Sequence, residues 1–353
     1  MAFYFISIVL LGFIAVYALM AVWAERKVSA WIQDRVGPVV TGKYGLLQTF
    51  ADIFKMLQKE DITPTLADKK LFLAAPILVF TAVFMGFATI PFSPTYISSS
   101  INIGIFYLLA IVSIEVLGIL MAGWASNNKY ALLGSIRSIA QIISYEIPAA
   151  LAILAVIMLF QTLNLQEICM QQGILSKQKI YFFGFWEVSK IGGIFAWTIF
   201  QAPHLLIAFV IYFIASLAEC NRTPFDIPEA ESELVAGFHV EYTGFKFGAL
   251  FLAEYAMMFL VSMIAAVLFF GGWNTPLPNL ASFALADYTT GAYWGIVWIL
   301  LKALSLVLLQ VWIRWTFPRY RMDQLMTLCW KVLIPLSFVI VLFSGIWKLF
   351  ILN

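Results

Sequence analysis

The chain has 353 residues, of which 63% are hydrophobic and only 11% charged, with a formal net charge of +2 at pH 7. Soluble domains carry roughly a quarter charged residues, so this composition excludes an ordinary soluble protein. Apolar runs of about 20 residues recur along the chain, and each is long enough to cross a hydrocarbon core of about 30 Å. The sequence therefore predicts an all-α, polytopic membrane protein with a single transmembrane domain over residues 1–353. A β-barrel would instead show alternating segments of about 10 residues.

Eight membrane-spanning helices are predicted. The first apolar run follows Met1 without a basic segment or a small-residue cleavage site, which indicates a retained span and not a signal peptide. No internal repeat is visible, which argues against a transporter built from inverted repeats. The predicted spans are residues 3–24, 71–92, 103–123, 138–160, 191–217, 248–270, 293–316 and 332–352.

The basic residues between these spans are distributed unevenly. On one side of the membrane, eight Lys and Arg residues fall in the first connection, two in each of the next two connections and four in the last. The opposite side holds four, and Lys302 lies inside the seventh span. Because basic residues concentrate on the cytoplasmic side, both termini are predicted to lie outside.

The first cytoplasmic connection, residues 25–70, contains an amphipathic helix too short to span a membrane. A turn-forming stretch, residues 33–38, precedes it. Two roles stay open: a structural path along the membrane surface, or the wall of a substrate entrance near the lipid headgroups. The apolar side of this helix holds Leu46, Leu47, Phe50, Ile53, Phe54 and Leu57, and the polar side holds Gln48, Asp52, Lys55 and Lys59.

Ionisable side chains occur inside or at the ends of several spans. Each would cost about 2.5–3.5 kcal/mol at a lipid-facing helix centre, so each is expected to face protein or water. Four carboxylates lie at similar depth near the predicted cytoplasmic face, on four different spans. Together they predict a buried proton route, since buried, like-charged carboxyl groups titrate closer to neutral pH. The four are Glu25, Glu146, Glu219 and Glu254.

The alternative is that each of these acids pairs with a local Lys or Arg and only fixes helix packing. Glu115, near the middle of the third span, is placed to extend the route inward. Lys302 is interpreted as a buried counter-charge.

The second cytoplasmic connection of interest, residues 218–247, is an acidic loop. Asp226 and Glu229 resemble a helix N-terminus with Pro228 between them, so capping explains these two acids. For Glu231, Glu233 and Glu241 the alternatives are a solvated face and a segment packed beneath a partner. Apolar residues among the acids favour the packed segment: Phe225, Leu234, Val235, Phe238, Val240 and Tyr242.

Redox and metal sites are not expected in this chain. The three cysteines are far apart and form no CxxC pair, and the two histidines lie on opposite sides of a loop boundary.

Several motifs of this chain closely resemble the H subunit of bacterial complex I, the proton-pumping NADH:quinone oxidoreductase. They follow in order along nearly the whole sequence. They are Glu25-Arg26-Lys27, Gln33-x-Arg35-x-Gly37-Pro38, Gly45 to Lys55, Gly123-Trp124 to Tyr130, Ser144-Tyr145-Glu146, Glu219 to Asp226, Glu229 to Val235, Glu241-Tyr242, Ala253-Glu254-Tyr255 and Pro318 to Met326.

The resemblance implies a subunit in the bacterial cytoplasmic membrane that forms a quinone-access chamber with the hydrophilic arm. FMN and iron–sulfur clusters would belong to partner subunits, and no cofactor to this chain. Other partners implied are small membrane subunits and antiporter-like subunits, and quinone is the implied substrate. Glu25, Glu146, Glu219 and Glu254 would carry protons. The quinone chamber would involve Arg26, Arg35, Arg222, Asp226, Glu229, Glu231 and Glu233.

Two positions depart from the family pattern. Val39 and Val40 stand where the family usually has Asn and a basic or polar residue, and Glu115 stands at a usually apolar position. Alternative functions are the membrane anchor of an energy-converting hydrogenase-type complex, a stand-alone proton-coupled transporter, and an assembly scaffold.

Overall fold

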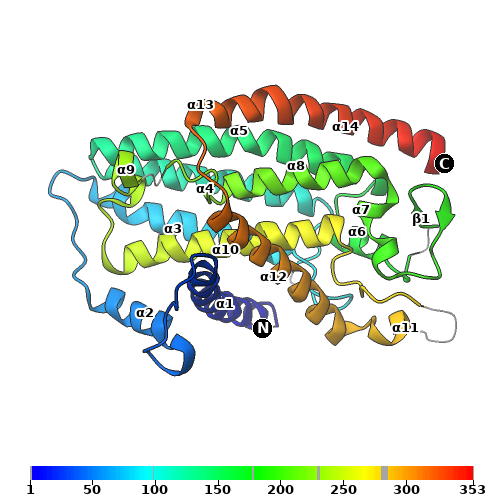
Figure 1. Cartoon of the computed structure of the whole chain (residues 1–353), viewed down its shortest axis with the longest axis horizontal. Coiled ribbons are helices and arrows are strands. Elements are labelled where there is room, and N and C mark those ends of the chain that lie inside the picture. The colour runs from blue at the N-terminus through cyan, green and yellow to red at the C-terminus, as the bar shows by residue number, and fades with distance from the viewer. Residues whose placement is uncertain (1, 98, 177–178, 229–230, 280–284, 353) are drawn as a thin grey trace.

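The computed structural model describes residues 2–97, 99–176, 179–228, 231–279 and 285–352, and it is almost entirely helical (Figure 1). In this part of the chain, seven helices are long and apolar enough to cross a membrane, and α8 (Pro203–Glu219) is a shorter apolar helix. The all-α, polytopic class is confirmed. The long elements are α1 (Ala2–Ile32), α3 (Lys69–Gly86), α4 (Gly104–Ala125), α5 (Lys129–Phe160), α10 (Gly244–Phe269), α12 (Ala292–Thr316) and the C-terminal helix, which comprises α13 (Met322–Thr327), η5 (Leu328–Leu333), α14 (Ile334–Trp347) and η6 (Lys348–Leu352).

Helix α10 is the centre of the bundle. Most residues in its apolar stretch are buried. The helix is hydrophobic all round, as expected of a helix enclosed by others. It packs against α3, α8 and α12. In Figure 1, α5, α8 and α14 run alongside one another, whereas α1 and α12 cross the bundle obliquely.

Several helices extend further toward the predicted cytoplasmic side than the hydropathy indicates. Helix α1 continues to Ile32, so Glu25 and Arg26 lie within it. Helix α5 begins at Lys129, where the Asn128 side chain accepts a hydrogen bond from the Tyr130 amide, and it includes Arg137. Charged residues lower the hydropathy without breaking a helix, so these helices are longer than the apolar runs.

The predicted fifth span, residues 191–217, is divided into three pieces. They are η3 (Gly193–Ala196), α7 (Thr198–Gln201) and α8 (Pro203–Glu219). Proline disfavours the α conformation of the residue before it, and Ala202 is extended, so a new helix starts at Pro203. At 1.5 Å per residue the 17 residues of α8 are about 26 Å long.

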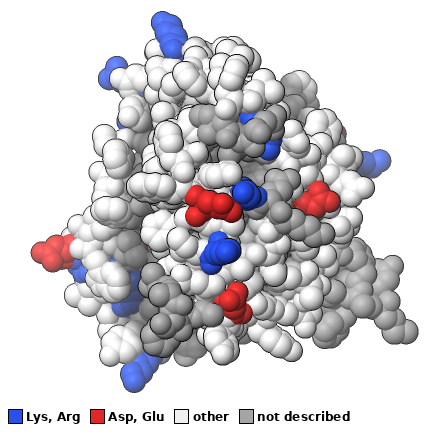
Figure 2. Space-filling view, turned by 90° about the vertical axis from the view of Figure 1, so that its right-hand side faces the viewer, with Lys and Arg blue, Asp and Glu red and all other residues white. Residues whose placement is uncertain are grey.

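The shorter elements complete the loops at the two ends of the bundle. At the end with the termini of α5, α8 and α14, a hairpin pairs β1 (Tyr181–Phe182) with β2 (Trp186–Glu187). The remaining short elements are η1 (Lys43–Gly45), η2 (Phe87–Thr89), α6 (Leu165–Gln171), α9 (Glu231–Leu234), η4 (Gly237–His239) and α11 (Leu285–Thr289). Figure 2 shows the end that carries the hairpin, where charged residues are sparse and most of the visible surface is uncharged.

The predicted amphipathic helix is present as α2 (Gln48–Gln58). Asp52 of its polar side faces the bundle, because the Asp52 carboxylate lies 2.6 Å from Nη1 of Arg26 on α1, whereas Lys55 is exposed. Phe50, Phe54 and Leu57 are exposed on its surface. The apolar side of α2 is therefore available to lipid or to a hydrophobic substrate.

Candidate functional site

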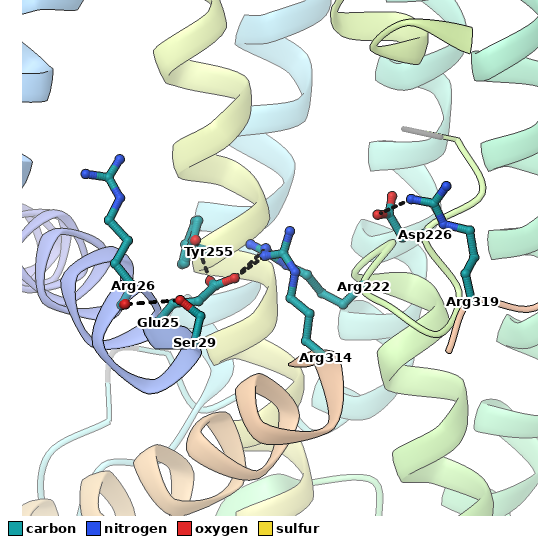
Figure 3. A network of polar contacts seen from close by, with 8 residues as sticks. All are labelled: Glu25, Arg26, Ser29, Arg222, Asp226, Tyr255, Arg314 and Arg319. Carbon is teal, nitrogen blue, oxygen red and sulfur yellow. Dashed lines mark hydrogen bonds and ion pairs between the residues drawn. The ribbon is translucent and has the colours of Figure 1, made fainter. Parts of the chain in front are cut away.

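A buried ion cluster joins four distant segments of the chain (Figure 3). Its centre is Glu25 of α1, which is only 5% exposed. Arg314 of α12 donates a hydrogen bond to Glu25, and the Tyr255 hydroxyl of α10 donates another at 2.5 Å. Nη1 of Arg222, in the loop after α8, lies 3.7 Å from Oε1 of the same carboxylate.

The cluster is built for close packing of charges. The Arg222 guanidinium lies over the Tyr255 ring, 4.5 Å from its centroid, and its side chain is almost fully buried. A cation held against an aromatic face in this way is stabilised by the ring electrons. Two guanidinium groups thus share Glu25, and we call the group of Glu25, Arg222, Tyr255 and Arg314 the ion cluster.

Asp226 lies in the same loop as Arg222, beside that cluster. Its Oδ2 accepts a hydrogen bond from Nη2 of Arg319 at 3.1 Å. Ile227 and Pro228, the two residues after Asp226, are not helical, so Asp226 does not occupy a helix N-cap as the sequence suggested. The sequence did not indicate the contact between Asp226 and Arg319, because the two residues are 93 positions apart in the chain.

A second group of acids surrounds a small cavity of about 10 Å³. Glu115 of α4, Glu219 of α8 and Glu254 of α10 all line it. His239 of η4 also lines it, and its Nε2 lies 3.0 Å from Oε1 of Glu254. We call this group, Glu115, Glu219, His239 and Glu254, the acid cavity.

The ion cluster and the acid cavity are adjacent through two short stretches of chain. Glu254 and Tyr255 are consecutive on α10 and belong to the cavity and the cluster respectively. Glu219 lines the cavity, and Arg222 follows three residues later in the cluster. A change of charge or position in one group therefore acts on the other over a short distance.

Glu146 is connected to the acid cavity from α5. The Ser113 hydroxyl of α4 donates a hydrogen bond to Glu146, and Glu146 lies within electrostatic range of Glu219. Of the four predicted route residues, Glu219 and Glu254 share the cavity and Glu146 lies near it, whereas Glu25 is held in the ion cluster. Glu115, to which the family resemblance assigned no role, is a member of the cavity.

The neutral residue that separates Glu219 from the arginine loop is Cys220. Burial raises the pKa of the Cys220 thiol well above its usual range, so this group stays protonated and neutral near pH 7. It therefore adds no negative charge to the acid cavity that it lines.

The remaining predicted chamber residues lie further out. Arg26 pairs with Asp52 and points away from Glu25 (Figure 3), and Arg35 is exposed. Glu233 forms a 2.6 Å ion pair with Arg137. Glu229 and the side chain of Glu231 lie outside the described residues.

The apolar residues of the acidic loop pack against the rest of the chain. Phe225, Leu234, Phe238 and Tyr242 are buried within the subunit, whereas Val235 is exposed. Glu241 accepts a 2.6 Å hydrogen bond from the Asn128 side chain. The apolar residues of the loop are therefore mostly packed. Of the acids, Glu233 is exposed and Glu241 is half-buried.

Two members of the site escaped the sequence analysis. Arg314 was counted among the four basic residues of the last connection. It falls inside the predicted span 293–316, so it could have been recognised as a charge within the membrane. His239 is buried in a loop, and nothing in its local sequence indicates a carboxylate partner fifteen residues later.

Known proteins resemble this chain over nearly its whole length. The NADH dehydrogenase family matches residues 5–345. The NADH-quinone oxidoreductase H subunit 2 of Cytophaga hutchinsonii is 56% identical, over 97% of this chain and 98% of its own. The chain belongs to the family of complex I H subunits. H subunits of Chlorobium luteolum and Chlorobaculum parvum are 53% and 52% identical, over 98% and 97% of this chain and 89% and 91% of theirs. The resemblance carried by the H-subunit motifs is confirmed.

Proposed function

We propose that this chain is the membrane subunit of a proton-pumping NADH:quinone oxidoreductase that forms the quinone-access chamber with the hydrophilic arm. The names of its relatives support quinone as substrate, and they favour this function over a hydrogenase-type anchor or a stand-alone transporter. FMN and iron–sulfur clusters belong to partner subunits in this proposal. The uneven distribution of Lys and Arg supports an orientation with the acidic loop in the bacterial cytoplasm and both termini outside.

The adjacency of the ion cluster and the acid cavity is the observation that carries the proposal. A quinone reduced near the cluster gains negative charge, which attracts Arg222 and Arg314. Because both arginines share Glu25, any shift toward the quinone weakens their hold on that carboxylate. Glu219 is three residues from Arg222, and Glu254 is next to Tyr255, so a movement in the ion cluster changes the surroundings of both acids.

Protons then move among the residues of the acid cavity. A cavity of about 10 Å³ holds about one water molecule, and such a water needs two to four polar partners. The carboxylates of Glu219, Glu254 and Glu115 supply them. Glu146 continues the proposed route onto α5, toward the antiporter-like partners.

The entrance for quinone is proposed at α2 and the segment before it. Arg35 and Val40 are exposed there, beside the outward apolar side of α2. Arg26, Glu229, Glu231 and Glu233 complete the proposed chamber with the arm subunits.

Quinone labelling tests the chamber. A photoreactive quinone analogue, irradiated with the intact complex, is expected to attach within residues 26–60 of this chain. Excess quinone should suppress the labelling, because both molecules compete for one entrance. Labelling confined to other subunits contradicts this entrance, and no labelling at all would favour the hydrogenase-type alternative.

Replacing Glu219 by glutamine tests the proton route. In the reconstituted complex, Glu219→Gln is expected to reduce the number of protons pumped per electron to about half or less, because the amide cannot take up a proton. Glu219→Asp retains the carboxyl group and should keep most of the pumping. A native proton-to-electron ratio in Glu219→Gln refutes the role of this residue.

A further inference from the structure

Helix α2 is attached to the bundle at two places, although its apolar side is turned outward. Within α2, all of which the structure describes, only Thr49 is buried. An isolated helix of 11 residues is marginal in water, so its position depends on contacts with other segments. One such contact is the ion pair of Asp52 with Arg26 of α1. In Figure 1, α2 lies at the margin of the bundle, beside α1.

The second attachment joins the segment after α2 to the start of α10. The Thr243 hydroxyl donates a hydrogen bond to the Glu60 carbonyl at 3.2 Å and accepts one from the Ile62 amide at 3.1 Å. Nζ of Lys246 on α10 lies 2.9 Å from Oδ1 of Asp61. Thr243 and Ile62 are 181 positions apart, so these contacts fix two distant segments together. We call this set of contacts, made by Glu60, Asp61, Ile62, Thr243 and Lys246, the α2 joint.

The backbones of α2 and α10 also approach each other closely at the α2 joint. Gly244, the first residue of α10, has a φ of +57°, which a residue with a side chain rarely adopts. A Cβ atom at Gly244 would lie 3.4 Å from the Lys59 carbonyl oxygen and 3.5 Å from that of Met56. Met56 and Lys59 lie at the C-terminal end of α2, so this end rests directly on the start of α10.

Lys246 is fixed from the side of the bundle. Its side chain is 12% exposed, and Nζ lies 5.2 Å from the centroid of the Phe72 ring on α3. The Tyr242 ring stacks on Phe72 at 4.1 Å, and the Tyr242 hydroxyl donates to the Phe72 carbonyl. The side chain of Asp61 is 57% exposed, so Lys246 positions Asp61 rather than the reverse.

The two attachments together hold α2 across two helices that meet at the ion cluster. Arg26 follows Glu25 on α1, and the Tyr255 hydroxyl of α10 donates to Glu25. With both attachments in place, α2 does not tilt away from α10 about its contact with Arg26. The exposed side chains of Phe50 and Phe54 therefore keep a fixed place beside α1 and α10.

We propose that the α2 joint positions α2 for quinone binding, with Asp61, Thr243 and Lys246 as positioning residues. The inference rests on the proposed quinone entrance at α2. A quinone binds more weakly to an apolar wall that must first be brought into place, because the cost of ordering the wall opposes binding. The three residues act through α2 and do not touch the reacting atoms, so their loss raises the KM for quinone and leaves kcat nearly unchanged.

Replacing Thr243 by valine tests the α2 joint in the purified intact complex. Valine keeps the shape of threonine but lacks the hydroxyl, so both hydrogen bonds are lost. Amide hydrogen exchange of residues 50–62 is expected to become about three- to fivefold faster, and the KM for a short-tailed quinone analogue to rise by a similar factor. Thr243→Ser retains the hydroxyl and should behave as the native complex. Lys246→Met should change exchange and KM in the same direction as Thr243→Val.

The exposed ion pair of Lys179 with Glu187 provides a control outside the α2 joint, and Lys179→Met should change neither quantity. Unchanged exchange in Thr243→Val or in Lys246→Met overturns the inference, and either variant decides the question if the other fails to assemble. Faster exchange with a native KM also overturns it, and so does a loss of kcat alone, which indicates a purely structural role. Photolabelling of the native complex tests the entrance without any variant, so a failure of the entrance is distinguishable from a failure of the α2 joint.

Discussion

Replacing Glu25 by glutamine is expected to abolish nearly all quinone reductase activity and to destabilise the folded subunit by about 3–5 kcal/mol. The substitution leaves Arg222 and Arg314 in a buried site without their shared carboxylate. Removing one partner of a buried ion pair is costly, because the charge that remains keeps its desolvation penalty. Activity in isolated membranes and the thermal stability of the purified complex are the measurements.

Two comparisons sharpen this test. Glu187→Gln removes an exposed carboxylate that lies 3.8 Å from Lys179, and a surface pair of this kind contributes about 0–1 kcal/mol. Adding Arg314→Met to Glu25→Gln removes one of the two guanidinium groups that share Glu25 and should restore part of the stability. If Glu25→Gln behaves like Glu187→Gln, the ion cluster has no such importance.

The fold class and the approximate depth of the acids were predictable from the sequence. Helical spans follow from apolar runs about 20 residues long, which hydropathy detects without knowledge of tertiary contacts. Glu146, Glu219 and Glu254 could be placed near one face because their positions along separate spans are fixed by the rise per residue. The amphipathic period that predicted α2 is likewise a local property.

The pairing of those acids was not predictable in the same way. Glu25 contacts Tyr255 and Arg314, which are 230 and 289 positions away in the chain. Hydropathy indicates how deep a residue lies in the membrane, but it does not show which faces of the helices meet. It could therefore not show that Glu25 lies in the ion cluster and not in the acid cavity. Lys302 shows the same limit, because its partners are backbone carbonyls that no side-chain pattern marks.

Gly134 of α5 carries the second large prediction, because the acidic loop approaches α5 at this point. A Cβ atom there would lie 2.7 Å from Cα of Gly237 and 3.0 Å from the Phe238 amide nitrogen. These are backbone atoms and cannot rotate away, so η4 must move. Gly134→Ala is therefore expected to lower quinone reductase activity about tenfold, at an overpacking cost of about 1–3 kcal/mol.

The loss would arise through His239, which follows Gly237 by two residues and contacts Glu254 at 3.0 Å. Moving η4 away from α5 withdraws the imidazole from the acid cavity. Gly12→Ala is the matched control, because no heavy atom lies within 4 Å of a Cβ at that position in α1. Alanine in a helix interior is otherwise stabilising by roughly 0.5–1 kcal/mol relative to glycine, so the control should be at least as stable as the native subunit. If Gly134→Ala shares that gain and keeps full activity, the close approach of η4 to α5 does not position His239.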